Sequence, residues 1–238
     1  SKTVIIKDNV VEFVKKDEPF IKLSKSSVSW GDYDRDGDMD LAIMGQSNAV
    51  GAVTAIYENK EGSFEDTNQN FTKVYDGDLS WVDLNKDGWL DLVVTGYNET
   101  AKTNIYINNE GQTFETSTAD WGIPNAYASK MSWGDLDNDG DLDIIIGGGL
   151  HNSMEEWGWY NPDPQRSYHG ILLNDGTGNF YKRGFEFPQH KNSNGFWYSN
   201  VPNISVADLD GDGDLDVING LVGVHYQGVA MVIEENIG

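Results

Sequence analysis

A nine-residue acidic pattern occurs four times in this chain of 238 residues. Each copy has the form D-x-[DN]-x-D-G-x-x-D, and the copies begin at Asp32, Asp83, Asp135 and Asp208. The steps between these residues are 51, 52 and 73, so the third repeat carries about 21 extra residues. Self-similarity at such a period is the signature of a repeat architecture, in which each copy is one structural unit.

Short apolar runs follow every copy of the pattern, and a Gly comes soon after each run. Runs of this length bounded by Gly indicate buried strands rather than helices. No segment has a sustained helical period with capping residues at its ends. The runs are Leu41–Met44, Leu92–Thr95, Ile144–Ile146 and Val217–Ile218.

A second strand-like stretch lies further along each of the first three repeats, and an Asn/Gly turn and then a Phe follow it. This spacing predicts hairpins. Each repeat is therefore expected to form about four short strands, which is the blade of an all-β protein, a β-propeller. The stretches are Ala55–Asn59, Asn104–Asn108 and Gly170–Asn174, followed by Phe64, Phe114 and Phe180.

The repeats predict a single β-propeller domain over residues 1–238 with about four blades. Two arrangements stay open. In the first, a strand within residues 3–14 completes the last repeat and closes a four-bladed ring. In the second, the chain is part of a larger propeller, for example one of about seven blades, and the remaining blades bind to this chain as its partners. The expected repeats span residues 26–75, 77–127, 129–200 and 204–238, and the third contains an insertion at 149–203.

The acidic pattern has the composition of a cation site. Side-chain oxygens at positions 1, 3, 5 and 9 can converge on one ion, position 7 can add a backbone carbonyl, and Gly at position 6 permits a sharp turn. Hard oxygen ligands in a flexible loop suit Ca²⁺ better than Mg²⁺. An EF-hand would need a bidentate Glu at position 12, where this chain has Ile43, Val94, Ile146 and Asn219.

Up to four Ca²⁺ ions are therefore expected, and we expect them to be structural because each loop holds a full set of ligands. The predicted ligands are Asp32, Asp34, Asp36, Asp38 and Asp40 in the first copy; Asp83, Asn85, Asp87, Trp89 and Asp91 in the second; Asp135, Asp137, Asp139, Asp141 and Asp143 in the third; and Asp208, Asp210, Asp212, Asp214 and Asp216 in the fourth. At position 7 the ligand is the backbone carbonyl.

The charge of the chain agrees with bound cations. Asp and Glu number 39 against 16 Lys and Arg, which gives a formal charge of −23. Carboxylates within about 5 Å of one another repel strongly or take up protons unless a cation lies between them. Because Asn85 replaces a carboxylate, the second site is expected to be the weakest.

Several classes of partner are disfavoured by the same composition. Nucleic acid and anionic membrane surfaces both need basic residues that this chain lacks. There is no apolar run of about 18 residues that could insert into a bilayer. The chain also has no Cys, which excludes disulfides and cysteine nucleophiles.

These residues resemble the FG-GAP/VCBS repeats of integrin-α-type propellers and of many secreted bacterial proteins. The pattern [SV]-[WV]-[GVA]-D-x-[DN]-x-D-G-x-[LM]-D-[LIV] describes all four copies. The resemblance implies a propeller with calcium in the loop between the first two strands of each blade. It also implies secretion or attachment to the cell surface, in an extracellular or periplasmic location. It does not fix the activity, because such repeats occur in adhesion receptors, lectins and polysaccharide lyases.

The insertion in the third repeat concentrates aromatic and His residues. A loop insertion on a repeat scaffold commonly carries function, and exposed aromatic rings can stack on sugars. The alternative is that these side chains pack the long loop onto its blade. The candidate ligand-binding residues are Trp157, Trp159, Tyr160, Arg166, His169, Trp197 and Tyr198. By contrast, Trp30, Trp81 and Trp133 recur at one repeat position and are expected to be blade-packing residues.

The function favoured by the sequence is a calcium-stabilised binding or adhesion propeller that recognises a glycan or an extracellular protein. The alternative is the propeller domain, or a fragment, of a polysaccharide lyase or hydrolase. The chain contains no G-x-S-x-G, P-loop or H-E-x-x-H motif. No catalytic residue is therefore assigned.

Overall fold

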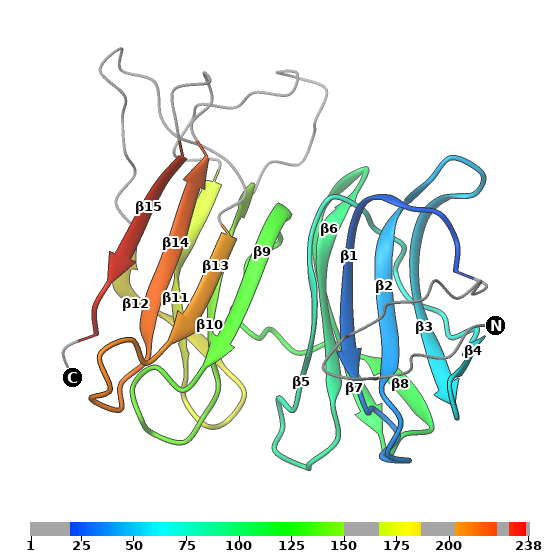
Figure 1. The fold of residues 1–238 in the computed structure, drawn as a ribbon, viewed down its shortest axis with the longest axis horizontal. Helices are drawn as coiled ribbons and strands as arrows, with labels where there is room; N and C mark the ends of the chain where they lie inside the picture. The colour runs from blue at the N-terminus through cyan, green and yellow to red at the C-terminus, as the bar shows by residue number, and fades with distance from the viewer. Residues whose placement is uncertain (1–19, 150–166, 187–202, 223–228, 237–238) are drawn as a thin grey trace, which may run out of the picture.

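Fifteen β-strands in four antiparallel sheets make up the part of the chain that the structure describes (Figure 1). This computed structural model describes residues 20–149, 167–186, 203–222 and 229–236. No helix occurs within these ranges. The prediction of an all-β protein built of propeller-like blades is confirmed.

Each sheet is one blade, and its strands follow one another in chain order. The first blade has β1 (Ser24–Gly31), β2 (Asp40–Ser47), β3 (Gly51–Lys60) and β4 (Ser63–Asp66). The second has β5 (Leu79–Val82), β6 (Asp91–Asn98), β7 (Thr100–Asn109) and β8 (Thr113–Thr116). The third has β9 (Tyr127–Gly134), β10 (Asp143–Gly149), β11 (Ser167–Asn174) and β12 (Phe180–Glu186). The fourth has β13 (Asn203–Ala207), β14 (Asp216–Val222) and β15 (Val229–Glu234).

The fourth blade has three strands among the described residues. The strand expected within residues 3–14, which would complete this blade, lies outside the described ranges. Strands β11 and β12 of the third blade fall inside the range expected as an insertion, 149–203. The connection from β10 to β11 spans residues 150–166, whereas residues 48–50 suffice to join β2 to β3.

First strands of neighbouring blades lie against each other. Strand β1 contacts β5, and β9 contacts both β6 and β13. The first strands therefore form the inner side of the array, and each sheet extends outward from them. The connections from first to second strand, which carry the acidic pattern, all lie at the lower end of the blades in Figure 1.

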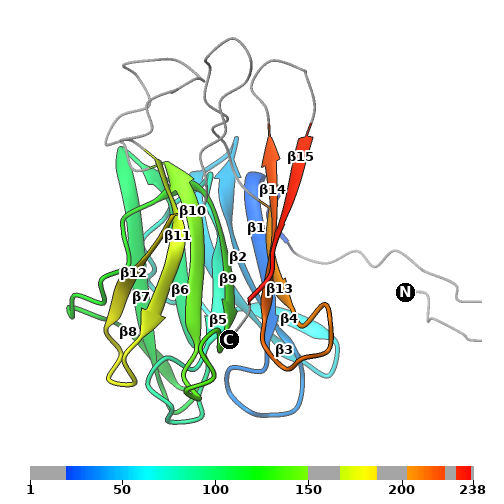
Figure 2. The same cartoon turned by 90° about the vertical axis from the view of Figure 1, so that its left-hand side faces the viewer.

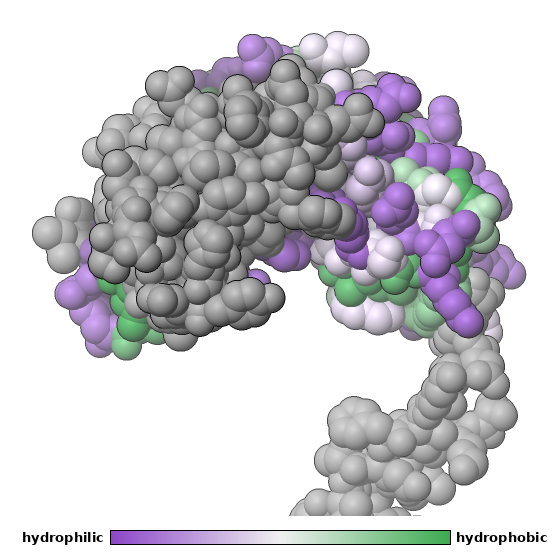
Figure 3. Space-filling model, turned by 90° about the horizontal axis from the view of Figure 1, so that it is seen from above, coloured by the Kyte–Doolittle hydropathy of each residue, from purple (hydrophilic) through white to green (hydrophobic). Residues whose placement is uncertain are grey.

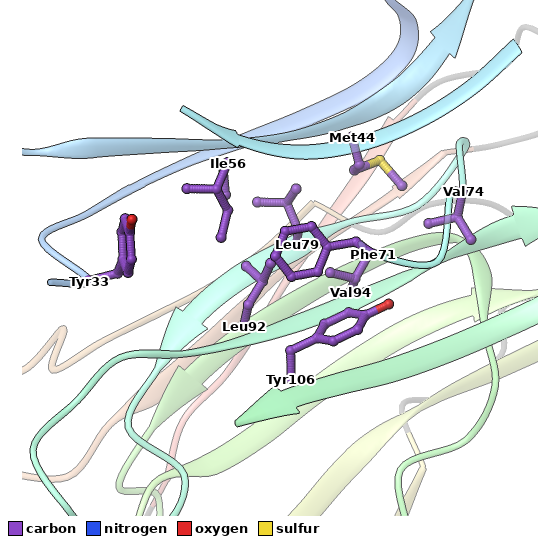
Figure 4. Close-up of a cluster of buried hydrophobic side chains, with 10 residues drawn as sticks. Tyr33, Met44, Ile56, Phe71, Val74, Leu79, Leu92, Val94 and Tyr106 are labelled. Carbon is purple, nitrogen blue, oxygen red and sulfur yellow. The ribbon is translucent and has the colours of Figure 1, made fainter. Parts of the chain in front are cut away.

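Apolar cores fill the spaces between blades. Because successive side chains of a strand point to opposite faces, Leu92 and Val94 face the first blade, whereas Val93 faces the third. Figure 4 shows the side chains of the first core converging from both sheets. This core comprises Tyr33, Ala42, Met44, Ile56, Phe71, Val74, Leu79, Leu92, Val94 and Tyr106.

The recurring Trp position packs between blades in two of its three copies. Trp81 stacks on Tyr33 with ring centroids 5.8 Å apart, and Trp133 packs against the core shared by the second and third blades. Trp30 differs from these two, because it is 52% exposed and contacts Phe64 of its own blade. No blade precedes the first one in the described part of the chain, so the face that carries Trp30 has no neighbouring sheet.

Both ends of the array expose apolar side chains. On the outer face of the first blade, Val28 is 59% exposed beside Trp30, although Phe20 and its neighbours cover part of this face. On the fourth blade, Ile233 is 61% exposed. Figure 3 shows hydrophobic (green) residues among hydrophilic ones at its right-hand end, where the first blade lies.

Asp78 connects three blades on the inner side of the array. Its carboxylate accepts hydrogen bonds from Ser27 Oγ at 2.5 Å, Lys130 Nζ at 3.1 Å and the Met131 N–H at 3.0 Å. The Asp78 side chain is 10% exposed and that of Lys130 is 32% exposed. A shielded carboxylate with three donors stabilises its surroundings more than an exposed ion pair does.

Replacing Asp78 by Ala is expected to lower the free energy of unfolding by about 2–4 kcal/mol, because a partly buried ammonium and an amide lose their acceptor. Chemical denaturation followed by Trp fluorescence measures this change. Glu115→Ala, at an exposed position of β8, is the control and should be nearly neutral. Equal effects of the two substitutions would contradict the role of Asp78.

Candidate metal centres

The four acidic loops share one backbone conformation. Each loop starts after the first strand of its blade, and its position 9 is the first residue of the second strand. The Gly at position 6 has a left-handed φ in every copy: +95° at Gly37, +89° at Gly88, +88° at Gly140 and +100° at Gly213. Only Gly adopts such values readily, so this residue permits the turn that the sequence predicted.

The position-9 carboxylate is buried and held by two backbone donors. Asp91 accepts from the Leu84 N–H at 3.0 Å and from the Asn108 N–H at 2.8 Å. The first donor is position 2 of the same loop, and the second is an Asn at the end of the third strand. The same pair of bonds occurs at Asp40, Asp143 and Asp216.

Burial also shifts the protonation of these carboxyls. It raises the pKa of Asp40 and of Asp91 to about 6, while the hydrogen bonds from the backbone act in the opposite direction. Burial likewise raises the pKa of Asp143. A buried carboxylate surrounded by other carboxylates is costly to keep charged, and a nearby cation removes that cost.

Position 1 contributes a carboxylate oxygen with no protein donor. In three of the loops, one buried oxygen of Asp32, Asp83 or Asp135 has no hydrogen-bond partner among the described residues. The other oxygen of each accepts from the N–H of the position-6 Gly, at 3.2, 2.9 and 3.0 Å respectively. Buried polar atoms are rarely left unsatisfied, so these oxygens are candidate ligands for a cation.

Carboxylate oxygens converge in three loops. In each, one oxygen from each of three Asp residues lies within 4.8 Å of the others. The second loop gives no such group of three acids, because Asn85 replaces one and its amide donates to Asp87 at 2.9 Å. The groups are Asp32, Asp34 and Asp36; Asp135, Asp137 and Asp143; and Asp208, Asp210 and Asp216.

Side chains at position 7 point to other partners, which leaves their backbone carbonyls as the possible ligands. The Asp38 carboxylate accepts from the Glu61 N–H at 2.7 Å in the turn between β3 and β4. The N–H of Asp38 is itself bonded to Asp36 at 2.8 Å, and Trp89 makes the equivalent bond to Asp87 at 2.8 Å. These turn-internal bonds fix the direction of the loop around the carboxylates.

The sequence analysis missed the Asn that buttresses each loop. Asn108 is 2% exposed, and its Nδ2 donates to the carbonyls of Leu90 at 3.0 Å and Tyr33 at 2.9 Å. The second bond reaches the acidic loop of the preceding blade. Asn59, Asn174 and Asn236 occupy the equivalent position, so recurrence of Asn at the end of the third strand could have revealed it.

Replacing Asn108 by Ala is expected to lower the free energy of unfolding by about 2–3 kcal/mol, because two buried carbonyls and the N–H of Gly111 lose their partner. Its neighbour Asn109 is exposed and supplies a matched control as Asn109→Ala. Thermal or urea melts of both variants test this. Similar small losses in both would show that the Asn side chain does not support the loop.

The candidate ligand-binding residues of the insertion are mostly not placed by the structure. Trp157, Trp159, Tyr160, Arg166, Trp197 and Tyr198 lie outside the described ranges. His169 lies in β11, where its backbone pairs with Gly147.

The fold and the loops define a protein of propeller-like blades with an acidic loop between the first two strands of each. A family model described as an FG-GAP-like repeat matches residues 32–94 and 83–146. The segment from Asp32 to Ile146 thus consists of FG-GAP-like repeats, which confirms the resemblance. Such repeats are typical of extracellular proteins. A search of curated proteins found no match. Within the described ranges, no helix has the length and apolarity needed to cross a bilayer.

Proposed function

We propose that this chain is a calcium-stabilised extracellular propeller that serves as a binding or adhesion module for a glycan or a protein. The observation that carries the calcium assignment is the buried, unpartnered position-1 oxygen, which recurs in three loops. Each of these oxygens belongs to a loop of oxygen donors, and hard oxygen donors in a turn suit Ca²⁺. When bound, the ion would neutralise the converging carboxylates and join the two strands that flank the loop.

The residues present fit such an ion best in three of the four loops, where three carboxylates converge. The second loop has the neutral Asn85 in place of one acid, so it would hold the ion least tightly. The fourth loop differs, because the corresponding oxygen of Asp208 accepts a hydrogen bond from the Gly211 N–H at 2.7 Å.

The binding function rests on the type of repeat and on the extra length of the third blade. A rigid array of blades presents its connections as a recognition surface. The long connections of the third blade carry the candidate aromatic residues, and the net charge of −23 favours a neutral or basic ligand over an anionic one. Secretion or surface attachment follows from the same proposal.

Removal of calcium is expected to lower the melting temperature strongly. A ligand that binds only the native state stabilises it by mass action, and this chain has no disulfide to compensate. Differential scanning calorimetry in chelator, in excess Ca²⁺ and in excess Mg²⁺ measures the effect, with Mg²⁺ restoring stability poorly. Identical melting curves in chelator and in Ca²⁺ would refute structural calcium.

Individual ligands are tested by isosteric substitution. Asp135→Asn removes charge from the unpartnered position-1 carboxylate and should weaken binding in the third loop by roughly tenfold or more, a loss of about 1.4 kcal/mol. Asp120→Asn, in an exposed turn outside the loops, is the control and should bind normally. Asn85→Ala should cost less calcium-dependent stability than Asp139→Ala. Calcium titration calorimetry distinguishes these outcomes, and equal, negligible effects would argue against the assigned ligands.

A further inference from the structure

Arg35, at position 4 of the first acidic loop, reaches across to the acidic loop of the second blade. Its guanidinium donates to the carbonyl of Gly88 and lies over the ring of Trp89, with Cζ 4.5 Å from the ring centroid. Gly88 and Trp89 are positions 6 and 7 of the second loop. The contact thus holds the peptide that precedes the predicted carbonyl ligand, the backbone oxygen of Trp89.

Equivalent contacts link the second loop to the third and the third to the fourth. Lys86 donates from Nζ to the carbonyl of Gly140 at 2.9 Å and pairs with the Asp141 carboxylate. The amide of Asn138 donates to the Asp214 carboxylate. In all three cases a position-4 side chain binds position 6 or 7 of the loop on the following blade.

The backbone at position 4 is held in a conformation that non-Gly residues disfavour. Its φ is +59° at Arg35, +58° at Lys86 and +58° at Asn138. Such a conformation is strained in a residue other than Gly. In the fourth loop, after which no further blade is described, position 4 is Gly211, and a Cβ there would meet nothing within 4 Å. The strained side chain thus occurs where a following loop is present to receive it.

We propose that the position-4 side chain is a positioning residue for the metal site of the next blade, so that the loops bind cations as a coupled row. This inference rests on the proposed function, since it concerns the same four loops. An ion in the first loop orders the strained turn that carries Arg35. The ordered guanidinium then fixes the carbonyl side of the second loop and reduces the ordering that a second ion requires.

Charge alone would predict the opposite effect, because a basic side chain repels a cation. The structure offsets this repulsion by giving each basic group a partner outside the cluster of ligand carboxylates. Lys86 pairs with Asp141, whose predicted ligand atom is its backbone carbonyl, and Arg35 lies on the ring of Trp89. The contribution of these residues is therefore to position peptides, and their removal weakens the next site.

If Arg35 and Lys86 only stabilised the fold, replacing them would lower the melting temperature and leave metal affinity unchanged. The side chain of Lys86 is 54% exposed, and Arg35 is exposed as well. Exposed charged contacts of this kind contribute little to stability. A positioning role is consequently visible in metal affinity, while the melting temperature in chelator changes little.

Luminescence of Tb³⁺, which occupies calcium sites and is sensitised by a nearby Trp, reports through Trp89 on the second loop and, because this ring lies against Arg35, also on the first. Asp32→Asn, which impairs the first loop, separates the two signals. In the full chain, Arg35→Gln is expected to weaken Tb³⁺ binding at the second loop by roughly fivefold or more. Trp89→Phe verifies the assignment, because it should abolish this signal. Lys73→Gln, which also removes one positive charge but at an exposed position outside the acidic loops, is the control and should leave the midpoint at Trp89 unchanged.

A double-mutant cycle tests the route of the coupling. Asp32→Asn, which impairs the first loop, should weaken the second site in the wild-type background and have no effect in the Arg35→Gln background. If the Tb³⁺ midpoint of Arg35→Gln is unchanged, or lies at a lower Tb³⁺ concentration than in the wild type, the inference is overturned while calcium binding stays intact. If the wild-type protein gives no saturable Trp89 signal, both this inference and the proposed second metal site are overturned. Near-ultraviolet circular dichroism confirms that each variant is folded.

Discussion

The sheets of the first three blades each have two apolar faces, and the arrangement of the described chain follows from the need to cover both. Val93 and its neighbours Leu92 and Val94 point to opposite sides of one strand, so the second blade requires a sheet on each side. Each blade that stacks on a neighbour covers one apolar face of that neighbour's sheet. The connections between first and second strands are thereby brought to one end of the array, where the acidic loops lie side by side (Figure 2).

Packing and electrostatics act against each other at these loops. The position-9 Asp is buried at the start of the second strand because its two oxygens cap backbone N–H groups, as at Asp40. The same burial raises the pKa of that carboxyl to about 6 and places it near other acids. The proposed cation would resolve this conflict, and it would account for a turn rich in carboxylates at the start of the buried second strand.

Local patterns predicted what is repeated, and they failed where one copy differs from the others. The strands, the Gly at position 6 and the acidic side chains of the loops recur, so spacing alone located them. Asp78 has no such repeat pattern, and its partners Ser27 and Lys130 lie about 50 residues away on both sides. Trp30 shares the sequence context of Trp81, but its exposure depends on whether another blade precedes it. Neither property is encoded in a short window of sequence.

The two apolar ends of the array are different surfaces. One presents Trp30 and Val28 from an inner strand, and the other presents Ile233 from β15. Where two described blades meet, one face of the first blade contacts the opposite face of the next. If the two ends of the array met in the same way, the contact would be head-to-tail. A two-fold symmetric dimer, which would place one end against an identical copy of itself, could not reproduce the packing that the blades use with one another.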